Sequence, residues 1–134
     1  MKKVLALLCL GALLLGSCKR ETKDERFKRE YEQFTRKECP KEVASCIRMD
    51  SICYDIESRT LTEYYTVSDK LDNDTMYTEE VVDDYRKGLL KELKGSIQMK
   101  PQKDESINFR YLYRSISTGD VLFELTFTPE DYGK

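Results

Sequence analysis

The side chains best suited to chemistry in this sequence are its cysteines, because the chain has five cysteines and no histidine. Without histidine, it can form neither a Ser-His-Asp or Cys-His catalytic arrangement nor a histidine-ligated zinc site. Cys39, Cys46 and Cys53 follow one another every seven residues, with no Cys-x-x-Cys pair to anchor a metal. We therefore predict no catalytic residue, no metal site and no cofactor, and that the protein is not an enzyme.

The carboxylates show no catalytic spacing either. Glu79, Glu80, Asp83 and Asp84 crowd the start of a predicted helix, where the helix dipole favours negative charge. The acidic segment 68–78 offers oxygen ligands that calcium prefers, but it lacks the glycine and the distal glutamate of an EF-hand loop. Both groups are therefore interpreted as solvated structure, the first as a helix start and the second as an exposed turn.

The N-terminal segment has the three regions of a secretory signal peptide. Lys2 and Lys3 form the positive region, an apolar run follows over residues 4–15, and small residues precede Cys18. The apolar run is shorter than the roughly 20 residues that a transmembrane helix needs. We therefore predict that residues 1–17 are a signal peptide and that the rest of the chain is exported.

Leu15-Gly16-Ser17-Cys18 resembles the lipobox of bacterial lipoproteins, with an aliphatic residue three before the cysteine and small residues between. The resemblance implies that Cys18 is lipidated, that it becomes the N-terminus, and that its acyl chains hold the protein on a lipid bilayer. Lys19 follows in place of the aspartate that retains lipoproteins at the inner membrane, which implies the outer membrane. The chain also resembles the short lipoproteins common in Bacteroidota. We expect residues 18–25 to be a lipidated tether and 26–134 a single domain.

The remaining cysteines would fold in an oxidising compartment, where two of the three are expected to pair. If Cys46 and Cys53 lie on one strand, they are roughly 23 Å apart, which is beyond disulfide reach. The bridge should then involve Cys39, with Cys46 favoured over Cys53 as its partner. One free thiol remains.

Two segments have the apolar spacing of amphipathic helices. Phe27, Tyr31 and Phe34 recur at intervals of four and three residues and predict a short helix that ends before Cys39-Pro40. A longer helix is expected to begin after Thr78, a good N-cap residue, and to stop near residue 95. Its apolar stripe consists of Val81, Val82, Tyr85, Leu89 and Leu93.

Two pairs of alternating segments predict β-hairpins. In the first, residues 52–56 and 61–67 are joined by the loop 57–60, and the side-chain pattern pairs Ile56 with Leu61 and Ile52 with Tyr65. In the second, residues 107–113 and 121–127 are joined through Ser117-Thr118-Gly119, with the glycine in a left-handed conformation. The second register pairs Tyr113 with Phe123, Tyr111 with Leu125 and Phe109 with Phe127.

The order helix, strand, strand, helix, strand, strand predicts an α+β fold with a four-stranded antiparallel sheet and helices packed on one face. This order is loosely similar to that of small exported modules of the PepSY and β-lactamase-inhibitor type. That similarity implies a fold and no functional residue.

A chain of 134 residues with a formal net charge of −2 suits one domain and disfavours nucleic acid as a partner. We predict a non-catalytic binding module tethered to the envelope, whose partner is an unknown envelope protein or ligand. Tyr64, on the second face of the sheet, is the candidate binding residue. The alternatives are a structural or assembly-factor lipoprotein of an outer-membrane complex and, third, a hydrolase inhibitor.

Overall fold

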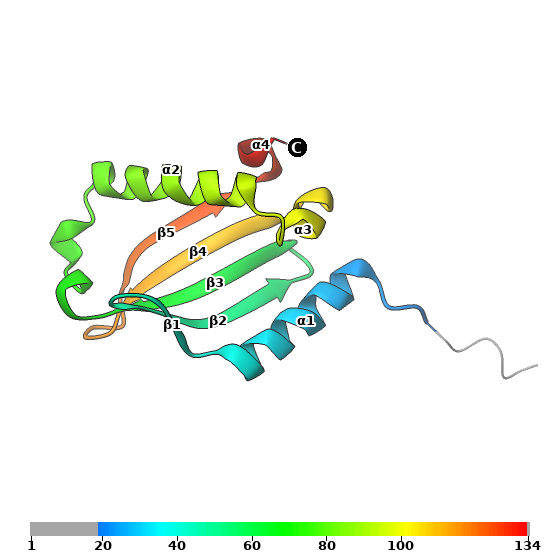
Figure 1. Cartoon of the computed structure of the whole chain (residues 1–134), viewed down its shortest axis with the longest axis horizontal. Helices are drawn as coiled ribbons and strands as arrows, with labels where there is room; N and C mark the ends of the chain where they lie inside the picture. The colour runs from blue at the N-terminus through cyan, green and yellow to red at the C-terminus, as the bar shows by residue number, and fades with distance from the viewer. Residues whose placement is uncertain (1–18, 134) are drawn as a thin grey trace, which may run out of the picture.

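The strands of this protein form one sheet, which helices cover on one side (Figure 1). The structure is a computed structural model, and it describes residues 19–133. The predicted signal peptide and Cys18 therefore lie outside the described residues. The elements are, in chain order, α1 (Lys23–Glu38), β1 (Lys41–Ala44), β2 (Ile47–Asp55), β3 (Thr60–Val67), the 3₁₀ turns η1 (Asp69–Leu71) and η2 (Asp74–Met76), α2 (Glu79–Gly95), α3 (Lys100–Asp104), β4 (Asn108–Ser115), β5 (Val121–Phe127) and α4 (Pro129–Tyr132).

Both predicted helices are present. Thr22 caps α1 through a capping box with Glu25, so the helix begins at Lys23 and includes the last part of the expected tether. Thr78 caps α2, as predicted, by accepting a hydrogen bond from the Val81 amide. The apolar stripes of the two helices pack against the same hydrophobic core.

The sheet differs from the prediction in strand number and direction. It has five strands in the order β1-β2-β3-β4-β5, and β3 pairs with β4 in parallel, whereas the other neighbours are antiparallel. The prediction of four antiparallel strands is therefore wrong in detail, although the α+β class is confirmed. The physical reason lies in the connection between β3 and β4. It contains α2, which carries the chain back along the sheet, so that β4 starts at the same end as β3.

The β4–β5 hairpin has the predicted register over its three predicted pairs, whereas a bulge after Tyr113 shifts the pairing beside the turn, and residues 116–120 form a longer connection than the expected one. Tyr113 pairs with Phe123, Tyr111 with Leu125, and Phe109 with Phe127. Gly119 has a φ of 76°, so the turn uses the left-handed conformation that glycine adopts without a steric penalty.

The β2–β3 hairpin is shifted relative to the prediction. Leu61 pairs with Tyr54 rather than with Ile56, and Ile56 lies in the turn. The Asp55 carboxylate accepts hydrogen bonds from the amide and the hydroxyl of Ser58, and these bonds stabilise a four-residue turn over 56–59, one position earlier than the expected one. A bulge between Met49 and Ser51 also shifts the register further along the strand.

Strand β1 and helices α3 and α4 were not predicted. All residues of β1 are exposed, so its sequence has no alternation of apolar and polar side chains. α3 and α4 are short and each has a proline in its first turn. Beyond Met49, the last residue of β2 that β1 pairs with, the Thr35 hydroxyl of α1 hydrogen-bonds both backbone groups of Ile52 at 2.9 Å and covers the free edge of β2.

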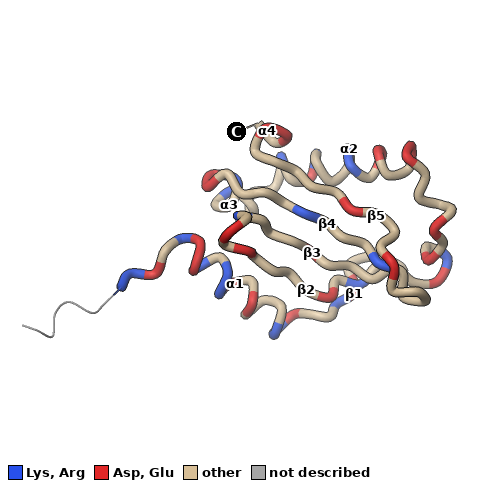
Figure 2. Tube along the Cα trace, turned by 180° about the vertical axis from the view of Figure 1, so that it is seen from behind, with Lys and Arg blue, Asp and Glu red and all other residues tan. Residues whose placement is uncertain are grey.

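The two faces of the sheet have different environments. The side chains on one face pack under α1 and α2, and among them Leu61, Val67, Phe109 and Phe127 are at most 2% exposed. Viewed from behind, the other face has no helix over it (Figure 2). The prediction that the helices pack on one face is therefore confirmed.

The structure gives no support to the predicted Cys39–Cys46 disulfide, because Cys39, Cys46 and Cys53 are all free thiols in it. Cys39 precedes β1 and Cys46 follows it, and the strand between them spans roughly 10 Å. Disulfide-bonded cysteines have their α-carbons about 4.4–6.8 Å apart. The unpredicted strand β1 therefore separates the two thiols that the sequence pairs.

Candidate functional site

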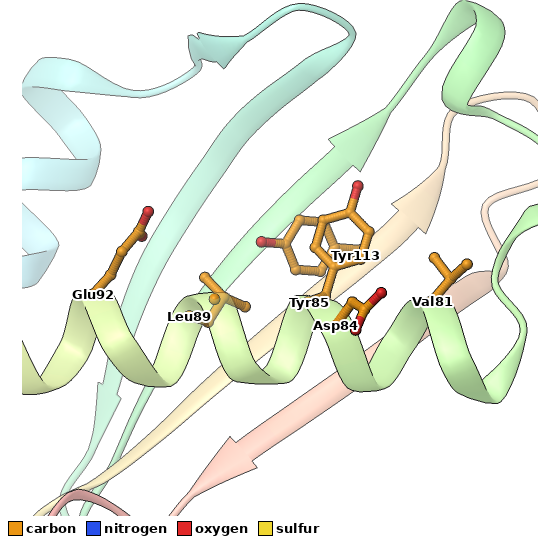
Figure 3. A pocket seen from close by; sticks show the side chains of 7 residues that line it. Val81, Asp84, Tyr85, Leu89, Glu92 and Tyr113 are labelled. Atoms are coloured by element: carbon orange, nitrogen blue, oxygen red, sulfur yellow. The ribbon is translucent and has the colours of Figure 1, made fainter.

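A groove runs along α2, between one face of this helix and Tyr113 of β4. Its volume is about 430 Å³, and we call it the α2 groove. The lining side chains are spaced three or four residues apart, so one face of the helix presents them. They project from one side of α2, where Tyr85 lies beside Tyr113 of β4 (Figure 3). The lining residues are Val81, Asp84, Tyr85, Gly88, Leu89, Glu92 and Tyr113.

A smaller cavity of about 170 Å³ adjoins the α2 groove, and the two share Leu89 and Glu92. We call it the Glu63 cavity, because Glu63 is the carboxylate buried at its base. The apolar part of its wall comes from Leu93 and Met99, in addition to Leu89. Tyr65, Ser96 and Tyr111 complete the lining.

Glu63 is 9% exposed, although it is charged and lies in the middle of a strand. It sits between Ile52 of β2 and Tyr111 of β4 in the sheet register. The Tyr65 hydroxyl donates a hydrogen bond to its Oε2 atom. Its side chain therefore faces the helices, together with the aromatic floor of the core.

The surroundings of Glu63 disfavour its negative charge. Burial raises the pKa of the Glu63 carboxyl, the hydrogen bond from Tyr65 opposes this, and the charge of Glu92 raises it further. Burial and then the charge of Glu63 also raise the pKa values of the tyrosines around it, so their hydroxyls stay protonated at neutral pH. These tyrosines are Tyr31, Tyr65, Tyr111 and Tyr113.

Aromatic rings form a continuous floor beside the two cavities. Tyr65 stacks on Tyr113 with ring centroids 4.8 Å apart, and Tyr113 stacks on Phe123 at 4.4 Å. Tyr85 of α2 packs on Phe123 at 5.1 Å and so joins the helix to this floor. Such stacks hold the rings in place and give the groove a rigid base.

Charges along the two cavities have one sign. Asp84, Glu92 and Glu63 contribute carboxylates, whereas no lysine or arginine of the described chain lines either cavity. Carboxylates clustered beside low-dielectric walls concentrate a negative potential. The site therefore favours a ligand that is apolar along much of its length and positively charged.

Tyr64, the binding residue predicted from the sequence, lies on the opposite, helix-free face and is half-buried. Its neighbour on β4 is the buried Leu112, and elsewhere on this face Arg110 and Glu124 form paired hydrogen bonds of 2.8 and 2.9 Å. The role of Tyr64 in binding stays a prediction. The structure does not bring it together with the α2 groove.

Sequence reasoning missed Glu63 and Glu92 as site residues. A signal for Glu63 was present, because it alternates with Leu61 and Tyr65 and must share their inward face. A carboxylate at such a position is rare unless it is paired. No comparable signal marked Glu92, which lies exposed on a helix rich in charge.

Within residues 19–133, no group of three or more Cys, Asp or Glu side chains is placed to hold a metal ion. No helix over the same range is both long and apolar enough to cross a membrane.

We predict that Glu63→Gln stabilises the domain increasingly as the pH rises. The folded-state pKa of Glu63 is raised, so between the ordinary carboxyl value of about 4.3 and that raised value the folded state binds more protons than the unfolded state. The unfolding free energy of the wild type then falls with pH, and glutamine removes this loss. Urea unfolding from pH 4 to 9 measures the difference, for which we expect about 1 kcal/mol or more at the alkaline end.

A second variant checks the direction in which the unfolding free energy changes with pH. The hydrogen bond from Arg110 lowers the pKa of Glu124, so Glu124→Gln should give a small stability loss that appears only above the carboxyl range. If Glu63→Gln destabilised the domain at every pH, the buried carboxylate would be stabilising and our account of its environment would be wrong.

The fold is similar to those of three solved bacterial proteins. A Pseudomonas aeruginosa protein described as secreted has a TM-score of 0.64 and 13% identity, over 85% of this chain and 99% of that chain. The pilotin EpsS of the Vibrio vulnificus type 2 secretion system has a TM-score of 0.63 and 10% identity, over 85% and 96%. The type II secretion pilotin AspS of Vibrio cholerae has a TM-score of 0.50 and 13% identity, over 79% and 95%. At these identities the likeness shows the fold alone.

The chain belongs to the family described as Domain of unknown function (DUF8479), which matches residues 22–123. This match covers both helices that flank the sheet and ends within β5. No match was found among curated proteins.

Proposed function

We propose that this protein is a lipid-anchored assembly factor of the bacterial envelope, and that it holds a segment of a partner protein in the α2 groove. The observation that carries the proposal is the groove itself, which is open, floored by fixed aromatic rings and lined by apolar and acidic side chains. A groove beside a helix, with apolar anchors at intervals along it, suits a peptide segment with an apolar face.

The comparisons support this role over a general binding module. Two of the proteins with the same fold are named as pilotins of type II secretion systems. A pilotin-like role combines the two features found separately here, a lipobox-like sequence at Cys18 and a groove for a partner. The protein would act at the outer membrane, without catalysis, and its acyl chains would concentrate it where the partner assembles.

The test is a substitution that fills the α2 groove without disturbing the fold. A Cβ added at Gly88 meets nothing within 4 Å, so the backbone position accepts a side chain, and Gly88→Arg adds a long one at the lining of the groove. Gly95→Arg is the matched control, because it makes the same change on the same helix outside the groove and has the same free space. We expect envelope proteins captured with the native lipidated protein to be lost from Gly88→Arg, at least about tenfold, and kept with Gly95→Arg.

Gly88→Ala distinguishes blocking of the α2 groove from a change in the stability of helix α2. Alanine improves helix propensity by roughly 1 kcal/mol and adds only a methyl group, so this variant should capture partners like the wild type. Equal capture by Gly88→Arg and Gly95→Arg would show that the α2 groove is not the partner site, and the proposed function would then fail.

A further inference from the structure

The feature that the proposed function leaves unexplained is the buried carboxylate of Glu63. A purely structural position in the middle of a sheet is better served by an apolar residue, because a buried carboxyl without a cation costs free energy, either as an unpaired charge or through the proton that its raised pKa makes it hold. Within residues 19–133, no ion pair involves Glu63, and no lysine or arginine is near enough to influence its pKa. The side chain therefore lacks a cation.

The Glu63 cavity has room to supply that cation from outside. Its volume of about 170 Å³ exceeds the space of a few water molecules. Glu92 lies at its rim and adds a second negative charge, while Leu89 and Met99 line the wall. A side chain with a long apolar stem and a positive end would match both the wall and the base.

The cavity also connects to the place where a partner's backbone would lie. Leu89 and Glu92 line both the α2 groove and the Glu63 cavity. A segment that occupies the groove can thus insert one side chain past Leu89 to Glu63 without leaving the groove. This continuity favours a side chain of a protein segment over a free cation.

We propose that the Glu63 cavity binds a single lysine or arginine side chain of the segment that occupies the α2 groove. This inference rests on the proposed function and names the chemistry of the partner. The cation would pair with Glu63, whose Oε2 atom Tyr65 already orients by a hydrogen bond. The hydroxyl of Tyr111 lies in the same lining and offers a further acceptor.

The probe is a library of peptides displayed on phage and selected on the lipidated full chain in detergent, with Gly88→Arg as the counter-selection. We expect the selected peptides to share one lysine or arginine flanked by apolar residues. Glu63→Gln should weaken them about tenfold to a hundredfold, as expected for loss of a charged hydrogen-bond partner. Glu57→Gln, at an exposed carboxylate in the β2–β3 turn, is the matched control and should bind like the wild type.

A double-mutant cycle assigns the contact. Changing the basic residue of a selected peptide to glutamine should lower its affinity for the wild type by the same factor as Glu63→Gln does. The same peptide change should cause little further loss of affinity when the protein already carries Glu63→Gln. Additive losses, or peptides without a basic residue that bind both proteins equally, would overturn this inference and leave the proposed function intact. Failure to select any peptide that Gly88→Arg excludes would overturn both. Binding of butylguanidinium alone, with no peptide selected, would assign the cavity to a free cation and would also overturn the inference.

Discussion

Cys18→Ala should abolish incorporation of an alkyne-labelled palmitate into this protein. The sequence Leu15-Gly16-Ser17-Cys18 predicts one lipidation site, and the other cysteines of the folded part lie at the end of α1, in the β1–β2 turn and in β2. Labelling in cells followed by a fluorescent click reaction measures the loss, which should reach background. Because each buried methylene contributes about 0.8 kcal/mol, loss of the acyl chains removes essentially all affinity for the bilayer.

The matched control is Cys53→Ala, which removes an exposed free thiol and should keep full labelling. Residues 19–134 fused to the signal peptide of a non-lipidated protein should be recovered in the soluble periplasmic fraction. Retention of label in Cys18→Ala would show that another cysteine is acylated, and the lipobox interpretation would then be wrong.

Phe127→Ala should destabilise the domain by about 3–5 kcal/mol, which is a large part of the stability of a domain this size. Phe127 is fully buried at the end of β5. Its ring packs edge-on against Tyr111 at 5.8 Å, and the Arg86 guanidinium of α2 lies 4.9 Å from its centroid. Truncation of the Phe127 side chain leaves a cavity between β5 and α2 and should lower Tm by more than about 10 °C.

Ile97→Ala is the control, because it also truncates a large apolar side chain, but one that is not buried. Ile97 is 85% exposed, so its truncation should change the unfolding free energy by less than about 0.5 kcal/mol. Circular dichroism melts of the two variants and the wild type give the comparison. A loss below about 1 kcal/mol for Phe127→Ala would contradict the packing of β5 under α2 that shapes the α2 groove.

The parts of the fold that were predicted correctly depend on neighbours in sequence. The β4–β5 register follows from side-chain alternation and a short turn, and both are encoded within about 20 residues. The start of α2 follows from Thr78 and the acidic residues after it, which are again local. The β2–β3 register was missed because hydrogen bonds from Ser58 to Asp55 favour a different turn.

The candidate site needs long-range contacts that no local pattern encodes. The inward side of Glu63 could be inferred from strand alternation, but its neighbour Tyr111 could not. The two lie side by side only because β3 and β4 pair in parallel. Glu92 reaches the same cavity from α2, 29 positions further along the chain than Glu63.

The sequence by itself determined the absence of histidine chemistry, the lipobox-like segment that ends at Cys18, and the helices and the hairpin whose signals lie within a short stretch of chain. Only the tertiary structure decided the parallel pairing of β3 with β4, the free thiols and the α2 groove. The physical reason is that a crossover connection and a buried charge depend on which distant segments pack together. Alternation and capping report only on the nearest neighbours of each residue.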